Sequence, residues 1–579
     1  MTVLGVNSVY HETSAALVQD GRVLASAEEE RFNRRKHGAT ARVDNAHELP
    51  EQAITYCLGE GGTDAADLDA VCFSFDPILR ERAGTLDPYA VEGDWGSAEG
   101  ERRFLRSLAA VPDALSDLLG TPVASKMRWI THHLAHAASS YYPSPYQEAA
   151  ILVVDGIGET ATTLLAFGSG SRIEVLKTIS FPNSLGFLWE KLSQLLGFTE
   201  YDACKVMGLA GFGDPEPYRA RIESVLQCGD GSFTVNDRIV RFRQPSGATL
   251  SRHLGALPAK LGRSHEDLAA ALQTRTNETI MELAAALHQQ RPTDAVCVAG
   301  GVALNCVANS ALKETGPFEK VFIPPSPHDG GTAVGAALYG YYQDGPPRSK
   351  TEERAEARHG PYLGPSFDEA EIDAALKRRR LDRSPTEQPE REAARLLAEG
   401  KIVAWFQGRM ELGPRALGNR SLLADARDPN VRDKLNCKVK HRETFRPFAP
   451  SVLAEEAREW FDLGRDSQSH EYMLFACPAH ERTHKELPAI VHVDGTARLQ
   501  TVRKETNPRF HGLLTAFRDL AGPPVLLNTS FNDSEPIVCS PDDALETFES
   551  TDIDALVIGE RVVEAKPSER TDEKSRVRG

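Results

Sequence analysis

The chain lacks the features expected of a membrane-bound, secreted or nucleic-acid-binding protein. No apolar run reaches the roughly 18 residues needed to cross a bilayer, and the first residues are typical of a β-strand rather than a signal peptide. Its nine cysteines are scattered with no C-x-x-C pair, which indicates reduced thiols. Acidic residues outnumber basic ones, 83 to 66, and the net charge of -17 argues against a broad surface for nucleic acid or anionic lipid. We therefore expect a cytoplasmic protein with neither kind of partner.

The length implies more than one domain. A chain of 579 residues with 41% hydrophobic and 26% charged residues is an ordinary globular protein too long for a single hydrophobic core. A charge-dense, polar stretch at 346–360 predicts a linker. We expect one domain over 1–350, a second over 361–565 and a disordered tail at 566–579.

Two histidines one helical turn apart predict half of a metal site. The segment from His133 to Tyr142 has no Gly or Pro and is typical of a helix. Residues four apart share a helix face, so His132 and His136 can direct their imidazoles to one centre. Such pairs also occur as ordinary buried histidines, so the pair alone does not decide between the two interpretations.

Two acids at strand ends provide the missing carboxylates. Asp155 follows the apolar strand 149–154, and Asp329 follows strand 319–323 and a proline-rich turn. With His132 and His136 they would form a mixed nitrogen and oxygen site suited to Fe(II), Mn(II) or Zn(II). Taken singly, each Asp-Gly pair would be an ordinary turn.

A strand-and-turn plan occurs twice in the first 350 residues. Strands around His11 and the Asp20-Gly21 turn are followed, after Asp155-Gly156, by strands at 162–167 and 172–179. We infer an α/β fold with two duplicated lobes and a ligand between them. Later, Gly300 and Gly301 join a strand to a helix, where backbone can approach a nucleotide, and Lys205 near another helix start can neutralise phosphate.

The second domain concentrates arginines in Gly/Pro turns. The segment from Arg409 to Arg420 contains a single acid, Glu411, whereas a solvated surface would intersperse more. Guanidinium groups in turns suit a polyanion such as an acyl phosphate or triphosphate. We therefore expect an anion site in this domain.

The region between the repeats is less regular. Segments 41–58 and 97–119 are predicted helical, and the piece from Leu79 to Gly96 is irregular and is a candidate lining for an acceptor site. Arg80 and Arg82 there are expected on a solvated face.

Together these motifs carry a family resemblance. The chain resembles the O-carbamoyltransferases of the nodulation-protein-U and cephamycin family, most closely the tobramycin carbamoyltransferase type. The matching segments are 27–32 (AEEERF), 36–38 (KHG), 132–137 (HHLAHA), 153–156 (VVDG), 205–210 (KVMGLA), 413–418 (GPRALG), 446–450 (RPFAP) and 527–532 (LNTSFN). They extend over nearly the whole chain, so the resemblance is specific.

The resemblance implies two domains with divided chemistry. The first would be an actin-like (ASKHA) domain similar to the tRNA threonylcarbamoyl transferase TsaD, binding nucleotide and iron. The second would be a YrdC-like α/β domain that makes carbamoyl adenylate from carbamoyl phosphate and ATP, with Mg. A hydroxyl of a small-molecule natural product would then accept the carbamoyl group. A homodimer is possible.

The resemblance also implies roles for individual residues. Lys440, Arg442, Ser530 and Asn532 match YrdC-like positions, and the anion pocket would be completed by Arg415, Arg420, Arg446, Arg498 and Asn528. The metal would be held by His132, His136, Asp155 and Asp329, and the adenylate by Asp155, Gly156, Lys205, Gly300, Gly301 and Asn305. His11 is the candidate general base, and Lys36 would orient acceptor or phosphate. Where family members often have His-Asp-Ala-Ser, this chain has His11-Glu12-Thr13-Ser14.

Two other functions fit part of the sequence. A tRNA threonylcarbamoyl transferase would share the first domain, but the acidic balance and the fused second domain argue against it. A non-catalytic, actin-like nucleotide-binding protein would not need the arginine-rich turns. A plain metallohydrolase would leave the C-terminal motifs unexplained.

Overall fold

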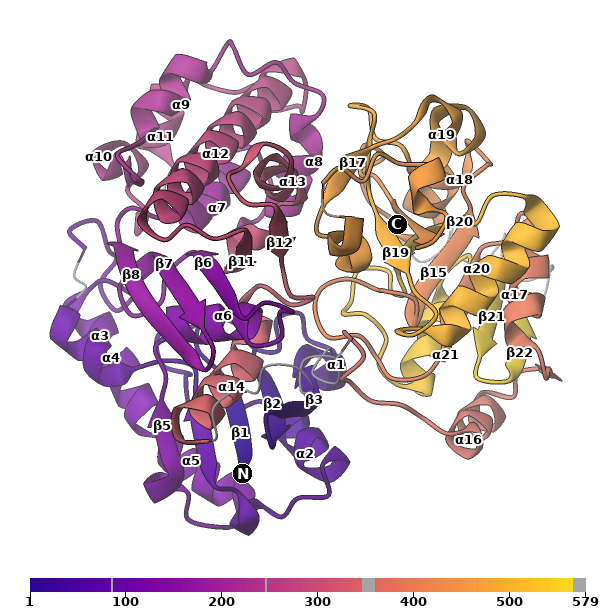
Figure 1. Ribbon diagram of the computed structural model, residues 1–579, viewed down its shortest axis with the longest axis horizontal. Helices are drawn as coiled ribbons and strands as arrows, with labels where there is room; N and C mark the ends of the chain where they lie inside the picture. Colours follow the sequence, from indigo (N-terminus) through magenta and orange to yellow (C-terminus); the bar gives the residue numbers. More distant parts are fainter. Residues whose placement is uncertain (85–86, 245–246, 346–359, 466, 566–579) are drawn as a thin grey trace. The chain divides into compact units, whose positions relative to one another are not determined.

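The chain forms two compact units. The computed structural model describes residues 1–84, 87–244, 247–345, 360–465 and 467–565 (Figure 1). The N-terminal unit contains 1–363, 464–469 and 474–476, and the C-terminal unit contains 364–463, 470–473 and the chain from 477 onward. Most of the predicted linker, residues 346–359, and the predicted tail at 566–579 lie outside the described residues.

The N-terminal unit contains two five-stranded sheets with the same strand order. The first sheet has the order β3-β2-β1-β4-β5, with β1 (Thr2–Asn7), β2 (Ser14–Gln19), β3 (Arg22–Glu28), β4 (Ala70–Phe73) and β5 (Met127–Trp129). The second has the order β12-β11-β6-β7-β8, with β6 (Glu148–Val154), β7 (Ala161–Ser169), β8 (Arg172–Ser180), β11 (Ala295–Ala299) and β12 (Lys320–Phe322). In each, three antiparallel strands form a meander whose first strand pairs in parallel with a later strand. The predicted mixed α/β character with two related lobes is therefore present in the strand order.

Two small-residue helices join the sheets. Helix α14 (Thr332–Asp344) packs on β1, β2 and β4, and helix α6 (His132–Tyr141) packs on β6 and β11. The two helices also pack against each other, so they form the middle of the unit (Figure 1). The approach is close because a Cβ on Gly335 of α14 would lie 1.8 Å from the carbonyl oxygen of Ala135 in α6.

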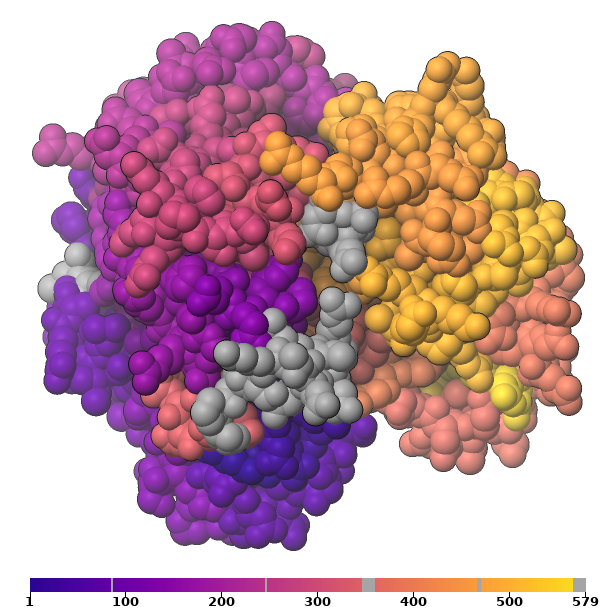
Figure 2. Space-filling view, viewed as in Figure 1, coloured from indigo at the N-terminus to yellow at the C-terminus, as the bar shows by residue number. Residues whose placement is uncertain are grey.

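Further helices surround the second lobe. They are α7 (Leu185–Leu195), α8 (Ala203–Ala210), α9 (Arg219–Val225), α10 (Asp237–Val240), α11 (Ala248–Leu254), the 28-residue α12 (Arg263–Gln290) and α13 (Cys306–Thr315). The hairpin of β9 (Leu226–Gly229) and β10 (Ser232–Val235) lies among them. In Figure 2 this part of the chain, drawn in magenta, forms a continuous part of the visible surface.

The first lobe is covered by shorter helices: α1 (Glu30–Asn33), α2 (Glu51–Glu60), α3 (Pro77–Ala83), α4 (Ala98–Ala109) and α5 (Val111–Leu119). The predicted helix over 41–58 is wrong in its first half, since α2 begins after Pro50, which cannot donate a hydrogen bond inside a helix. The predicted helix over 97–119 is two helices, and the second has Pro112 in its first turn.

The C-terminal unit is one eight-stranded sheet between two hydrophobic cores. Its order is β13-β22-β21-β14-β15-β20-β16-β19, with β13 (Ser384–Pro385), β14 (Val403–Phe406), β15 (Arg420–Asp425), β16 (Ala449–Leu453), β19 (Gln500–Val502), β20 (Val525–Ser530), β21 (Ala555–Ile558) and β22 (Arg561–Glu564). Alternate residues face opposite cores: Ala404 and Phe406 belong to one, and Val403 and Trp405 to the other.

Helices cover both faces of this sheet. Helices α17 (Pro389–Ala398) and α20 (Pro508–Ala521) supply Leu397 and Phe510 to the core that contains Trp405. Helices α16 (Glu369–Arg379) and α21 (Pro541–Ser550) supply residues to the opposite core. Shorter helices α18 (Val431–Lys434) and α19 (Glu481–Glu486) complete the unit. Among the described helices of either unit, none combines the length and apolarity that crossing a bilayer requires.

Candidate functional site

Helix α6 supplies two imidazoles to a buried cluster. His132 and His136 lie one turn apart on the same face, and both side chains are fully buried. Their Nε2 atoms are 3.2 Å apart. The predicted helical spacing therefore does bring the two rings to one point.

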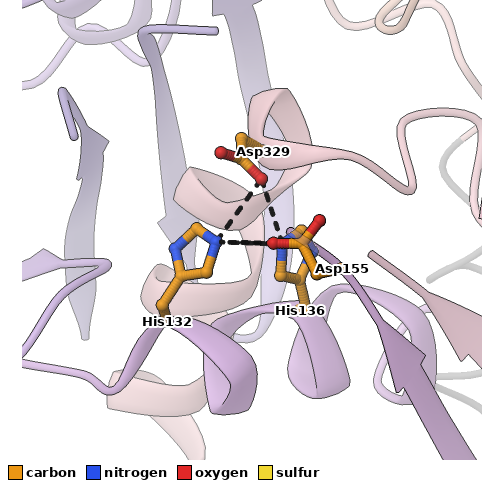
Figure 3. Close-up of side chains that lie close together, drawn as sticks. All are labelled: His132, His136, Asp155 and Asp329. Carbon is orange, nitrogen blue, oxygen red and sulfur yellow. Dashed lines mark hydrogen bonds and ion pairs between the residues drawn. The ribbon is translucent and has the colours of Figure 1, made fainter. Parts of the chain in front are cut away.

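Two carboxylates from separate segments complete the cluster. Asp155 directly follows β6, and Asp329 begins a short 3₁₀ turn before α14. Asp329 Oδ1 lies 3.2 Å from Nε2 of His136 and 3.4 Å from Nε2 of His132. Asp155 Oδ2 lies 3.5 Å from Nε2 of His132 and 3.8 Å from Nε2 of His136. Figure 3 shows all four side chains pointing inward to a common centre.

The donor set has the dimensions of a metal site. The four ligand atoms all lie within 4.8 Å of one another. Metal–ligand bonds of about 2.1 Å in a tetrahedral arrangement place neighbouring ligand atoms about 3.4 Å apart, and the observed separations of 3.2–3.8 Å bracket that value. Two imidazole nitrogens and two carboxylates suit Fe(II), Mn(II) or Zn(II).

The charges in this cluster favour a bound cation. Burial by itself would lower the pKa of His132, but the facing carboxylates of Asp329 and Asp155 raise it well above the ordinary histidine value. Burial and the neighbouring Asp329 would raise the pKa of Asp155, yet the imidazoles lower it to about 2. Two ionised acids buried together need a positive charge between them, whether it is a proton or a metal ion.

A glutamate that follows Asp155 in the chain fixes the start of α6. Glu159 Oε1 accepts hydrogen bonds from the backbone nitrogens of His132 (2.9 Å) and Asp76 (2.7 Å). Arg80 donates to the backbone carbonyl of Glu159 and forms a paired hydrogen bond, 2.8 Å on each side, with Glu101. The prediction that Arg80 is solvated is therefore wrong: the side chain is 1% exposed because Glu101 neutralises it inside the fold.

A second cluster surrounds Glu12. His37 Nδ1 lies 2.5 Å and His11 Nδ1 lies 3.9 Å from Glu12 Oε1, and His328 Nε2 lies 3.5 Å from Glu12 Oε2. The ring of Tyr201 packs on His37 and His11, with centroids 4.4 and 5.7 Å apart. Burial opposes ionisation of Glu12, but the histidines lower its pKa well below the usual glutamate range. Glu12 therefore carries the negative charge around which the histidines of this cluster gather.

The predicted glycine turns lie beside Asp155. The backbone nitrogen of Gly301 donates to Asp155 Oδ1 at 2.7 Å, and Gly300 has a φ of +92° where a Cβ would meet the carbonyl oxygen of Val154 at 2.2 Å. Gly156 packs on the ring of Phe187. A side chain at Gly300 would therefore collide with the backbone of Val154, so this turn requires glycine, and its approach to a nucleotide stays a prediction.

Three other predicted residues lie in different surroundings. Lys205 pairs with Asp202 at 3.2 Å rather than pointing to open solvent. Asn305 caps α13 by accepting from the nitrogen of Ala308, and its amide is paired with Gln273, so its side chain is already satisfied. Lys36 is exposed.

The C-terminal unit gathers a buried lysine with two polar residues after β20. Lys440 Nζ donates to the backbone oxygens of Ser530 (2.5 Å) and Asn532 (2.7 Å) and to Asn532 Oδ1 (2.7 Å). Burial and the nearby Arg442 lower its pKa well below the ordinary lysine value. The charge of Arg446 also lowers the pKa of Lys440, so these three basic residues lie in one region.

A polar network in the middle of the same sheet positions Asn528. Its amide donates to Ser451 Oγ (2.9 Å), Gln500 Oε1 (3.1 Å) and the carbonyl oxygen of Ala416 (3.3 Å). The last contact brings the turn that carries Arg415 to β20, and Arg498 ends β18 (Thr496–Arg498), two residues before Gln500. Arg415 and Arg498 therefore stand next to, and two residues before, residues of this network, and their place in an anion pocket stays a prediction.

Arg420 does not belong to this pocket, which corrects the prediction. Its guanidinium is fully buried and donates to the backbone oxygens of Gln407, Gly408, Asn419 and Pro365. The group therefore stabilises the turn instead of facing an anion. Glu411 also stabilises the turn, because its Oε1 accepts hydrogen bonds from the backbone nitrogens of Leu417, Asn419 and Arg420.

Several residues of the site had no signal in the sequence. Glu159, Glu190 and Arg243 lie outside any recognisable spacing, and only the fold shows their neighbours. Glu190 on α7 faces Gly156, where its Oε1 is 3.9 Å from the position of an added Cβ. Burial and the charge of Asp155 raise the pKa of Glu190 to about 8.

Comparisons with known families cover most of the chain. The family described as "Carbamoyltransferase N-terminus" matches residues 2–338, and the family described as "Carbamoyltransferase C-terminus" matches residues 394–565. The nodulation protein NolNO of Sinorhizobium fredii is 37% identical over 98% of this chain and 81% of its own length. The nodulation protein U of the same species is 29% identical over 92% of this chain and 94% of its own length.

Solved structures show a more distant likeness. An activator of 2-hydroxyisocaproyl-CoA dehydratase from Clostridium difficile is 13% identical, covers 59% of this chain and 96% of its own, and has a TM-score of 0.33. A ROK hexokinase from Thermus thermophilus is 16% identical, covers 59% of this chain and 99% of its own, and has a TM-score of 0.28.

Proposed function

Because the chain belongs to the carbamoyltransferase family, we propose that it is an ATP-dependent O-carbamoyltransferase that acts on a hydroxyl group of a small natural product. The observation that carries this proposal is the match of both halves of the chain to the two halves of that family. The actin-like identity of the N-terminal unit and the YrdC-like identity of the C-terminal unit form part of the proposal, as does the likeness to the tobramycin type.

The C-terminal unit would make the activated donor. Hydrolysis of carbamoyl phosphate gives phosphate and carbamate, and attack of the carbamate oxygen on the ATP α-phosphate gives carbamoyl adenylate and pyrophosphate. Both substrates are polyanions, so the basic groups Lys440, Arg442 and Arg446 would neutralise them. Ser530 and Asn532 hold Lys440 in place through three hydrogen bonds, which fixes the position of its charge. Arg415, Arg498 and Asn528 would complete the pocket.

The N-terminal unit would use that donor. The acceptor oxygen forms a bond to the carbamoyl carbon, the bond from carbon to the phosphate oxygen breaks, AMP leaves, and the hydroxyl proton goes to a base. His11 is the proposed base, supported by its place beside Glu12 and His37 at the end of β1. The glycine backbone at Gly156, Gly300 and Gly301 would admit the adenylate next to Asp155.

The metal would be held by His132, His136, Asp155 and Asp329. When bound there, a divalent ion supplies a positive charge that polarises the carbonyl and stabilises the charge that develops on it. Glu159 accepts a hydrogen bond from the backbone nitrogen of His132 and would so help to position the helix that carries both histidines.

The test is direct product detection. The full chain is incubated with ATP, Mg²⁺, carbamoyl phosphate and a panel of hydroxylated natural products, and the products are analysed by mass spectrometry. The proposal predicts an acceptor whose mass increases by one carbamoyl group, together with pyrophosphate and AMP. Carbamoylation that proceeds unchanged without ATP would contradict it.

A further inference from the structure

Three buried polar atoms near the metal cluster have no hydrogen-bond partner within the described part of the chain. They are Oδ2 of Asp87, Nε1 of Trp95 and Nε of Arg243. The first two belong to the loop 87–97, which the hydrogen bond from Asp87 N to Gly96 O closes at 2.9 Å. Buried donors and acceptors normally have partners, so these three atoms are available to bind a polar ligand.

Asp87 and Arg243 both lie against Gly96, the residue that follows Trp95. A Cβ on Gly96 would come within 3.1 Å of Asp87 Cβ and 3.5 Å of Arg243 Cγ, so these two residues flank the backbone next to Trp95. The ring of Trp95 packs on Tyr10 with centroids 5.8 Å apart. Asp87 is 8% exposed, whereas Trp95 and Arg243 are partly exposed, so the cluster can be reached from solvent.

Arg243 is unusual because it has no ion-pair partner among the residues that the structure describes. Its guanidinium lies over the rings of Phe181 and Phe187, with distances of 5.4 and 5.1 Å to their centroids. The charge of Asp87 raises the pKa of Arg243, but the carboxylate lies beyond ion-pair distance of the guanidinium. Burial lowers the pKa of Arg243, so a cation held here at a cost fits a binding role better than a purely structural one.

The cluster adjoins the metal ligands on two sides. Phe187, which stacks with Arg243, also packs on Gly156 next to Asp155. Tyr10, which packs on Trp95, meets the ring of His132 edge to face at 6.3 Å. A molecule that contacts Trp95 and Arg243 is thus one side chain away from the proposed site of carbamoyl transfer.

We propose that Asp87, Trp95 and Arg243 bind the acceptor, and that they select a neutral compound with neighbouring hydroxyl groups. The inference rests on the proposed function, since it places the acceptor of that reaction. A carboxylate accepts from a hydroxyl, whereas the indole and guanidinium donate to one, so a hydroxyl group can satisfy either kind of partner. The charges of Asp87 and Arg243 are opposite and lie close together, so the cluster has no net charge to offset that of an acidic or a basic compound. The aromatic rings can cover the apolar face of such a compound.

Binding of named probes tests the site without catalysis. Dissociation constants of the full chain are measured by calorimetry for methyl α-glucopyranoside and myo-inositol as neutral probes, and for glucuronate and glucosamine as charged ones. We expect the neutral probes to bind best, and Trp95→Phe and Arg243→Met each to weaken them about ten-fold, since each variant removes a hydrogen-bond donor. Arg238→Met changes an exposed arginine five residues before Arg243 and should bind as the parent does.

The outcomes separate the site from the proposed function. If the neutral probes do not bind, if a charged probe binds more tightly, or if both variants bind as the parent does, the site is wrong. If Arg243→Met does not fold, as judged by its thermal unfolding, Trp95→Phe decides alone. If binding behaves as expected but the bound probes are never carbamoylated, the site stands as a polyol site and the proposed function fails. If carbamoylation occurs and the variants leave the KM for the acceptor unchanged, the proposed function stands and the site fails.

Discussion

Four side chains from distant parts of the N-terminal unit meet at a single buried point, and removing one of them should remove the metal. His136→Ala leaves three ligands and a cavity at the cluster. We expect the affinity for the metal to fall by roughly 100-fold, because the loss of supporting residues alone already lowers metal affinity by about 10 to 100-fold. Mass spectrometry of the purified protein measures the metal that stays bound. His11→Asn is the control, since His11 lies outside the four, and it should retain its metal.

His11→Asn should separate the two chemical stages. As the proposed base, His11 acts only on the acceptor hydroxyl, so its loss is expected to reduce acceptor carbamoylation by about 10² to 10⁴-fold. Pyrophosphate release from ATP and carbamoyl phosphate should continue. Loss of both activities would show that His11 has some other role.

Lys440→Met should abolish pyrophosphate release but spare transfer from supplied carbamoyl adenylate. Lys440 is buried and its three hydrogen bonds fix a charge at the proposed anion site. Lys438→Met, an exposed lysine two residues earlier, is the matched control and should release pyrophosphate as the parent does. If transfer also disappears in Lys440→Met, the division of labour between the two units is wrong.

Lys440 also predicts a dependence of stability on pH. Because burial lowers its pKa in the folded chain, the unfolded state binds more protons than the folded state at pH values between the folded pKa and about 10.4. The unfolding free energy of the parent should therefore rise with pH in that window relative to Lys440→Met, by at most about 1.4 kcal/mol per pH unit. Denaturant unfolding of both proteins at several pH values measures this difference. A difference that falls as pH rises would contradict the assignment.

At the scale of single residues, spacing and side-chain chemistry were enough to predict the four residues of the metal cluster. His132, His136, Asp155 and Asp329 were predicted from helical periodicity and strand ends, and the structure brings them together. The predicted surroundings of Arg80 and Arg420 were wrong for the same reason. Whether an arginine is exposed, paired or bonded to backbone depends on distant partners such as Glu101, which no local pattern reveals.

At the scale of elements, the closeness of two helices sets the geometry of the metal cluster. Helix α6 carries both histidines, and α14 directly follows the turn that contains Asp329. Gly335 allows them to touch, because any side chain there would collide with the carbonyl oxygen of Ala135. The absence of Gly and Pro predicted the helix from His133 to Tyr142, but its contact with α14 could not be predicted, since it depends on the packing of both sheets.

Gly335→Ala should therefore separate the helices and disturb the cluster. Overpacking of this kind costs about 1–3 kcal/mol, and we expect a lower thermal midpoint together with reduced metal content. Gly59→Ala is the matched control, because Gly59 lies in helix α2 with nothing within 4 Å of an added Cβ. It should be neutral or slightly stabilising, by up to about 1 kcal/mol. Equal behaviour of the two variants would show that the contact between α6 and α14 does not limit the cluster.

At the scale of the whole molecule, we propose that each unit carries out one stage of the reaction. The N-terminal unit contains the duplicated sheets and the histidine and aspartate cluster, and the C-terminal unit contains the buried lysine and the arginine-rich turns. The family resemblance implied this division, and each half of the chain matches its own half of the family. The acceptor could not be predicted, because its candidate pocket is made by an irregular loop and a turn that are distant in sequence.

The stoichiometry of AMP tests the central claim most directly. With an acceptor identified by mass spectrometry, the full chain is supplied with carbamoyl phosphate and with ATP labelled in the α-phosphate, and labelled AMP and carbamoylated acceptor are counted together. If carbamoyl adenylate links the two units, the chain forms one AMP for each carbamoyl group transferred. Carbamoylated acceptor that accumulates from carbamoyl phosphate without AMP would contradict the account.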